Sequence, residues 1–174
     1  MAYPRRTFLS LVLGSCWLPA QPWFEAAAVA AAAASGAPEE RERLVEEQLV
    51  WLTNERRTAE GRAILTWSGP LAEVARCHSV DMMTRTYFDH LSPDHKGPSD
   101  RLRQHGLNVS WWAENLYSLT RGPGDPRTAA TRVFNGWLRG RSHRRAIFNR
   151  RCGSVGVGAC WRQQRLLVTE LFGA

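Results

Sequence analysis

At 174 residues, with 44% hydrophobic and 10% aromatic content, the chain is long enough to bury the core of one domain. Its net charge is +7, and residues 121–165 hold eleven arginines and a single acidic residue, Asp125. This asymmetry predicts a basic face for anionic envelope polymers or lipid headgroups, and nucleic acid is not expected because no nucleic-acid motif accompanies the arginines. Coding bias is an alternative explanation, since Lys96 is the only lysine.

Residues 1–34 have the character of a secretory signal. Arg5 and Arg6 precede an apolar run over residues 8–18, and an alanine-rich tract follows it. The paired arginines favour a twin-arginine signal, with an ordinary Sec signal as the alternative. Cys16 also lies in a sequence similar to a lipid-attachment box, and acylation there would tether the protein to a membrane. We therefore expect a secreted, periplasmic or cell-envelope protein.

Three helical patterns follow, after a lead-in over residues 35–43. The first runs from about Glu40 and ends at Gly61, and the second starts at Ser68-Gly69-Pro70 with an apolar stripe that includes His78, which we expect to be a satisfied internal histidine. Residues 89–100 are typical of an ordered loop, with a short helix after it over residues 99–105. Pro126 opens the third long helix.

The spacing of apolar residues changes from a helical to a strand pattern after His143. Apolar residues alternate over residues 155–161, and a second apolar run covers residues 166–172, with a polar turn between them. Helices first and strands last predict an α+β domain with helices packed on a small sheet.

Two histidines and one carboxylate stand out in three separate segments: His90, Glu114 and His143. If the fold gathers them, they could hold a divalent metal such as zinc, or transfer protons without one. Each also has a structural alternative: His90 a loop hydrogen bond, Glu114 an anchor for loop amides, and His143 a packing role. The sequence lacks the common nucleophile and metalloprotease motifs, so the catalytic residues, if there are any, stay unknown.

The cysteines allow one disulfide. Cys152 and Cys160 flank a glycine-rich segment, and an exported protein favours a bond between them. Inert thiols are the alternative. Cys77 lies in a helical pattern among apolar neighbours, and we expect a buried free thiol there.

Several short motifs follow one another from about Leu44 onward: Asn54-Glu55-Arg56-Arg57, Leu71 with Ala75 and His78, Phe88-Asp89-His90, Arg101 with Gly106, Glu114-Asn115-Leu116, Trp137 with Ser142-His143-Arg144, Gly156-Val157-Gly158, and Thr169 with Phe172-Gly173. No single motif is specific, but in this order they resemble the CAP superfamily of cysteine-rich secretory proteins, antigen 5 and pathogenesis-related proteins, in its bacterial SCP-like form. The resemblance covers residues 44–174.

This resemblance implies a three-layer α-β-α sandwich with a small antiparallel sheet between helices. It also implies a large cleft with two histidines and two acidic residues, and His90 and Glu114 match two of these four. The second acid falls on Gly140 and the second histidine on Leu167, so both are lost. His143 matches a Gly/Ser-His-Arg element of bacterial members.

Two functions follow as expectations. The first is binding of a lipid or anionic envelope ligand in or near the cleft, without turnover, by His90, Glu114 and His143. The alternative is a zinc-assisted hydrolase of peptide or cell-wall material, with the same three residues as metal ligands. The cofactor, the oligomeric state and the ligand's identity stay open.

Overall fold

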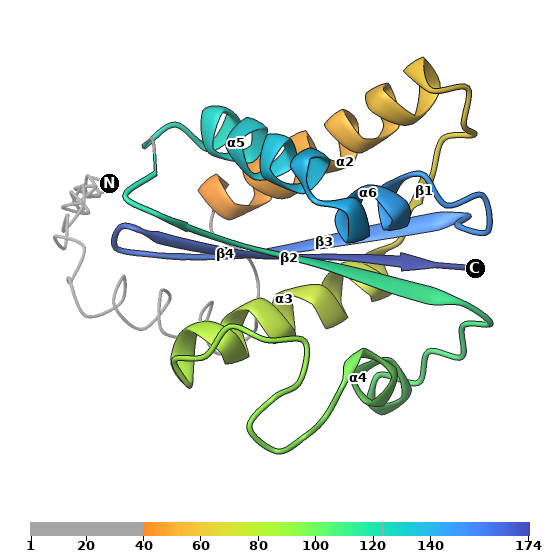
Figure 1. The fold of residues 1–174 in the computed structure, drawn as a ribbon. Coiled ribbons are helices and arrows are strands. Elements are labelled where there is room, and N and C mark those ends of the chain that lie inside the picture. Colours follow the sequence, from red (N-terminus) through yellow and green to blue (C-terminus); the bar gives the residue numbers. More distant parts are fainter. Residues whose placement is uncertain (1–39, 123) are drawn as a thin grey trace, which may run out of the picture.

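The chain folds into three layers, with one sheet between two groups of helices (Figure 1). The computed structural model describes residues 40–122 and 124–174. The predicted signal segment, its paired arginines and Cys16 lie outside the described residues. In chain order the elements are α2 (Glu40–Ala59), β1 (Thr66–Trp67), α3 (Gly69–Thr84), α4 (Pro98–Gln104), β2 (Trp112–Thr120), α5 (Pro126–Arg139), α6 (Arg141–Ile147), β3 (Ser154–Arg162) and β4 (Arg165–Gly173).

The sheet has the strand order β1-β3-β4-β2. The hairpin β3–β4 is antiparallel, and β2 pairs antiparallel with the other side of β4 along its whole length. The two-residue strand β1 is parallel to the start of β3, which makes the sheet mixed. The α+β sandwich is confirmed, and β1 and β2 are additions that the sequence pattern did not predict.

The helix boundaries follow from local capping. The Ser68 hydroxyl accepts from the backbone N–H of Leu71, and the Asp125 carboxylate accepts from that of Thr128, so α3 and α5 each begin with an N-cap followed by a proline in the first turn. Gly61 follows the end of α2 with φ +63°, a left-handed conformation that favours glycine. These positions agree with the predicted starts and end.

Apolar clusters lie on both faces of the sheet, one large cluster on one face and two smaller ones on the other. The larger one packs α2, α5 and α6 against the sheet and contains the fully buried Trp137, whose indole N–H donates to the Leu116 carbonyl of β2 at 2.9 Å. The smaller ones pack α3 and α4 on the other face. There the α3 backbone comes so close to β3 that a Cβ on Gly156 or Gly158 would lie within 2.2 Å of it.

The open edge of β3 is covered by carboxylates from α2. Beyond the short strand β1, the backbone N–H of Ala159 donates to Glu46 at 3.0 Å, and that of Trp161 donates to Glu42 at 2.6 Å. Glu46 is buried and is paired with Arg76 of α3 at 2.8 Å. These side chains satisfy backbone donors that no neighbouring strand reaches.

The expected disulfide between Cys152 and Cys160 is wrong, because the two sulfurs are not joined. Cys152 precedes β3, whereas Cys160 lies near the far end of the same strand. A strand rises about 3.3 Å per residue, which separates them by on the order of 20 Å, far beyond the reach of a disulfide. Cys77 carries a free thiol as expected, but it is exposed rather than buried.

Candidate functional site

The three predicted site residues line one pocket at the outer edge of β2. Glu114 and Asn115 are neighbours on β2, so their side chains lie on opposite faces of the sheet. The loop after α3 brings His90 to the pocket, and α6 brings His143. The pocket has a volume of about 220 Å³ and is lined by His90, Trp111, Ala113, Glu114, Asn115, Ser142, His143, Arg145, Ala146 and Asn149. His90, Glu114 and His143 thus line the same pocket, which is smaller than the large cleft that the resemblance implied.

Glu114 is held at both of its carboxylate oxygens. Oε1 lies 2.7 Å from Nδ1 of His90, and Oε2 accepts from Nη2 of Arg101 of α4 at 2.7 Å. The side chain of Glu114 is only 1% exposed, and that of Arg101 is 10% exposed. A buried carboxylate requires such partners, because an unpaired charge away from water is strongly unfavourable. Neither oxygen is left free to face the pocket.

The loop that carries His90 is anchored by two buried side chains. His78 of α3 contacts the Asp89 carbonyl through Nε2 at 3.1 Å, and Arg101 donates to the His90 carbonyl at 3.0 Å. Burial lowers the pKa of His78 to about 4, so its ring is neutral at physiological pH. The prediction that His78 is a satisfied internal histidine rather than a site residue agrees with this position.

The pKa values of the two pocket histidines are shifted in opposite directions. The hydrogen bond to Glu114 raises the pKa of His90, while burial, and then the neighbouring charge of His90, lower the pKa of His143. The surroundings therefore favour the charged form at His90 and the neutral form at His143. Nδ1 of His143 is buried and has no hydrogen-bond partner among the described residues.

The position of the His143 ring explains why residue 140 is a glycine. A Cβ at that position would lie 2.6 Å from Nδ1 of His143. A side chain there would collide with the imidazole, so the loss of the acidic residue at Gly140 leaves room for His143. Leu167, where the resemblance placed the second lost histidine, is fully buried between Met82 and Leu116.

The residues present do not fit a zinc site. The Glu114 carboxylate is already paired with the Arg101 guanidinium and hydrogen-bonded to Nδ1 of His90, so a metal ion would have to compete with both partners. Within residues 40–122 and 124–174, no group of three histidine, cysteine, aspartate or glutamate side chains is placed to hold a metal ion. The predicted metal set of His90, Glu114 and His143 is therefore not formed in this arrangement.

A buried carboxyl on the central strand supports the pocket from behind. Glu170 of β4 is fully buried, accepts from the Thr53 hydroxyl at 2.8 Å, and accepts from the Asn115 amide at 3.1 Å. The same amide lies 3.4 Å from the His143 carbonyl. Asn115 thus connects the core of the protein to the helix that carries His143.

The charge of Glu170 should make the stability pH-dependent. Burial raises its pKa from 4.5 to about 7, so between these values the folded state keeps a proton that the unfolded state has lost. Stability from this group therefore falls as the pH rises. We compare the free energy of unfolding of Glu170→Gln with that of the wild type. We expect the difference, variant minus wild type, to be about 2–3 kcal/mol larger at pH 8 than at pH 5.

Urea denaturation of both proteins at the two pH values measures this difference. The opposing effect of His78, whose lowered pKa makes the protein less stable in acid, is present in both and cancels. A difference that does not change with pH would contradict an ionisation of Glu170 near neutrality.

Three residues of this arrangement were not singled out as site residues from the sequence. Glu170 had a signal, since a glutamate inside the apolar run over residues 166–172 is unusual for a central strand. Arg101 stood in the family resemblance beside Gly106, but nothing in the sequence assigned it to the pocket. Arg145 had no signal, because arginines are common in this chain.

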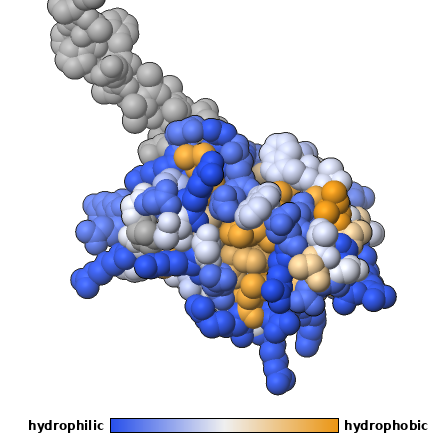
Figure 2. All heavy atoms as spheres, turned by 90° about the horizontal axis from the view of Figure 1, so that it is seen from above, coloured by the Kyte–Doolittle hydropathy of each residue, from blue (hydrophilic) through white to orange (hydrophobic). Residues whose placement is uncertain are grey.

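The outer face of α2, α5 and α6 is mostly hydrophilic, with an apolar strip between charged side chains (Figure 2). Arginines of residues 121–165 belong to this side of the molecule through α5 and α6, and Arg141, Arg144 and Arg145 are exposed. None of the helices in the described part of the chain has the length and apolar character that a membrane span requires.

Comparison with known proteins gives consistent matches. The family model described as CAP, the cysteine-rich secretory protein family, matches residues 50–166. Two proteins of Bacillus subtilis strain 168 are similar to this chain. The first, the uncharacterized membrane protein YlbC, is 36% identical over 114 residues. These residues are 65% of this chain and 31% of that protein. The uncharacterized protein YkwD is 30% identical over 163 residues, 84% of this chain and 61% of the relative.

A solved structure shares the fold. It is an extracellular protein containing an SCP domain from Bacillus anthracis strain Ames, with a TM-score of 0.66 and 27% identity, and the similarity covers 76% of this chain and 41% of that one. This chain spans less than two thirds of the length of each of these three proteins.

Proposed function

This chain belongs to the cysteine-rich secretory protein (CAP) family, and we propose that it is an exported binding protein of the cell envelope. Its ligand presents an anionic group to the pocket between His90 and Arg145, and no reaction follows. The signal-like character of residues 1–34 supports the export, as does the similarity to the extracellular protein of Bacillus anthracis.

The observation that carries this proposal is the bonding of Glu114. Both of its oxygens are hydrogen-bonded, one to Arg101 and one to His90, so the charge of the one carboxylate among the described residues that line the pocket is already balanced by cationic partners, which disfavours a role as a base. The groups left to a ligand are donors: the His90 ring, which is 52% exposed and whose charged form is favoured by Glu114, and the Arg145 guanidinium. A site of this kind favours an anion over a substrate awaiting hydrolysis.

The size of the pocket restricts the part of the ligand that enters. Pockets for whole drug-sized molecules have about 300–1,000 Å³, and this one has about 220 Å³. A single phosphate group fits that volume, whether it comes from a lipid headgroup or from a phosphate-bearing envelope polymer. The arginine-rich surface around α6 would hold the rest of such a ligand electrostatically.

Binding of the full-length protein to two probes tests the proposal and separates the two sources. The first probe is vesicles of phosphatidylglycerol, and the second is a soluble glycerol-phosphate polymer. We expect His90→Gln and Arg145→Gln each to weaken binding about tenfold, a loss of about 1.4 kcal/mol. Binding should also fall as the pH rises through the elevated pKa of His90, because the ring then loses its charge.

Matched controls come from α4 and the residue that follows it. Arg103 and His105 are both exposed and do not line the pocket, so Arg103→Gln and His105→Gln should bind as the wild type does. Equal weakening by these controls would mean that the charge acts diffusely, without the pocket. Absence of binding to both probes would reject the anionic ligand.

A further inference from the structure

Two tryptophans remain exposed at the opposite edge of the sheet from the His90 pocket. Trp51 of α2 is 55% exposed and Trp67 of β1 is 56% exposed. Both line a groove of about 580 Å³ between α2 and α3, which we call the tryptophan groove, together with Arg43, Glu46, Glu47, Val50 and Arg76. Tryptophan is among the largest apolar side chains, and leaving two indoles in water beside one groove is typical of a binding surface.

The charges around the tryptophan groove are already paired with one another. Arg76 bonds to Glu46 at 2.8 Å and to Glu73 at 3.3 Å. Arg43 pairs with Glu40 at 2.6 Å and also with Glu47. The groove therefore presents two flat apolar rings and bonded ion pairs, and its lining has two arginines and two glutamates, so it offers no unpaired positive charge. Such a surface matches a neutral ligand and gives an anionic headgroup nothing to bind.

The Trp67 ring is held in place from one side. A Cβ on Gly69, at the start of α3, would lie 3.2 Å from this ring, so the indole packs against the first turn of that helix. The rest of its surface is open to the groove. A ring fixed in this way loses little freedom when a ligand stacks on it.

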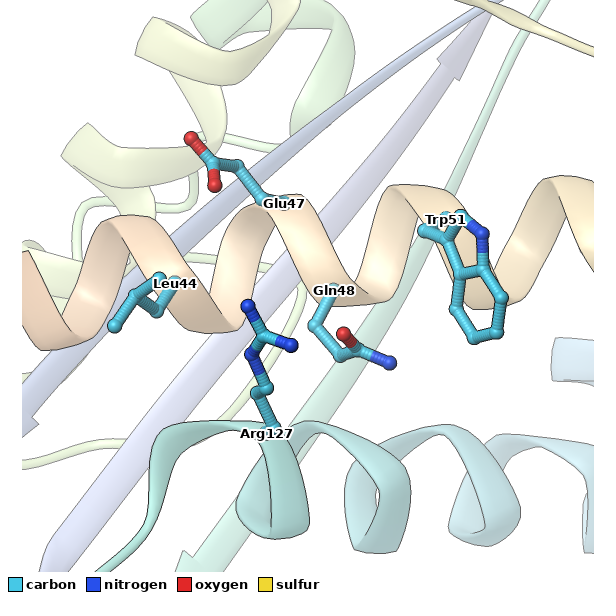
Figure 3. A pocket seen from close by; sticks show the side chains of 5 residues that line it. All are labelled: Leu44, Glu47, Gln48, Trp51 and Arg127. Carbon is cyan, nitrogen blue, oxygen red and sulfur yellow. The ribbon is translucent and has the colours of Figure 1, made fainter.

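Trp51 extends the binding surface along α2. It also borders a second hollow of about 440 Å³ between α2 and α5, lined by Leu44, Glu47, Gln48, Trp51 and Arg127 (Figure 3). Figure 3 shows Gln48 and Arg127 reaching into the space between the two helices. The two hollows share Trp51 and Glu47 in their linings, so they adjoin at the outer face of α2.

We infer that the tryptophan groove binds a neutral oligosaccharide. The C–H face of a sugar ring is flat, apolar and slightly positive, and it stacks on the negative face of an indole. The sugar hydroxyls accept from and donate to the paired charged side chains and Gln48 at the rim. Two indoles place two sugar rings, and the second hollow takes the continuation of the chain. The inference does not depend on the anionic ligand proposed for the His90 pocket.

Calorimetric titration of the full-length protein with chitotetraose and with cellotetraose, both uncharged, tests this site. We expect saturable binding of at least one of them. Trp51→Ala and Trp67→Ala should each weaken it at least tenfold, while Trp51→Phe should retain part of it because a flat ring remains. Raising the salt from about 0.05 M to about 0.5 M should leave the affinity unchanged, since no charge is neutralised on binding.

Trp112→Ala is the matched control, because Trp112 is 38% exposed and lies outside the tryptophan groove. It should bind both sugars as the wild type does, and so should His90→Gln. The inference is overturned if neither sugar gives a saturable titration, or if Trp112→Ala weakens binding as much as Trp51→Ala. Indole-dependent retention on phosphatidylcholine vesicles without sugar binding would also overturn it, and would identify a membrane-facing surface instead.

Discussion

Replacing Gly158 by alanine should abolish the stable fold, with a loss of more than about 4 kcal/mol. The added Cβ would lie 2.0 Å from the backbone nitrogen of Arg76 and 2.3 Å from the carbonyl carbon of Ala75. Both atoms belong to the α3 backbone, so no side-chain rotation relieves the overlap. The helix itself would have to leave the sheet, and with it the contacts that the α3 side of the core makes with β3. Urea denaturation followed by circular dichroism measures the effect.

Gly153→Ala provides the control for this substitution. Gly153 lies just before the same strand, and a Cβ there meets no atom within 4 Å. We expect its stability to stay within about 0.5 kcal/mol of the wild type. A Gly158→Ala protein that unfolds at nearly the wild-type urea concentration would show that α3 packs less closely on β3 than these distances require.

The second large effect is expected from Arg101→Met. Arg101 bonds to Glu114 at 2.7 Å, to the His90 carbonyl at 3.0 Å and to the Lys96 carbonyl at 3.1 Å. Methionine fills a similar volume but leaves the buried Glu114 carboxylate with His90 as its one remaining ionic partner among the described residues. Breaking a buried pair on one side costs about 3–5 kcal/mol, and we expect a loss in this range together with loss of anionic-ligand binding.

A double variant separates charge from shape. In Arg101→Met/Glu114→Gln the buried carboxylate is replaced by a neutral amide, so we expect the double variant to be more stable than Arg101→Met alone. Arg103→Met, which removes an exposed arginine of the same helix, should change little. If Arg101→Met lost less than about 1 kcal/mol, the pairing with Glu114 would not be the anchor of this site.

The helices could be predicted because their signals are local. Ser68 and Asp125 cap α3 and α5, each with a proline in the first turn, and Gly61 ends α2 in a left-handed conformation. The hairpin β3–β4 could be predicted because its residues are apolar in a strand pattern. Such features act within a few residues and do not depend on the rest of the fold.

Strand β2 could not be predicted in the same way. Its residues Glu114 and Asn115 are polar neighbours that face opposite sides of the sheet, so the strand shows no alternation. Each is satisfied only by a distant partner, Arg101 for Glu114 and Glu170 for Asn115. The sequence therefore singled out His90, Glu114 and His143, whereas the pairing of Glu114 with Arg101 and of Asn115 with Glu170 depends on contacts that form only in the folded chain.

The carboxylates of α2 along the open edge of β3 have a consequence beyond this molecule's own stability. An uncovered strand edge is a template on which a second chain can extend the sheet, and growth of that kind leads to aggregation. Here the N–H groups of Ala159 and Trp161 are already bound by Glu46 and Glu42, and an incoming strand would meet two inward-pointing acidic side chains. The same residues that join α2 to the sheet therefore keep separate copies of the domain from adding their strands to one another.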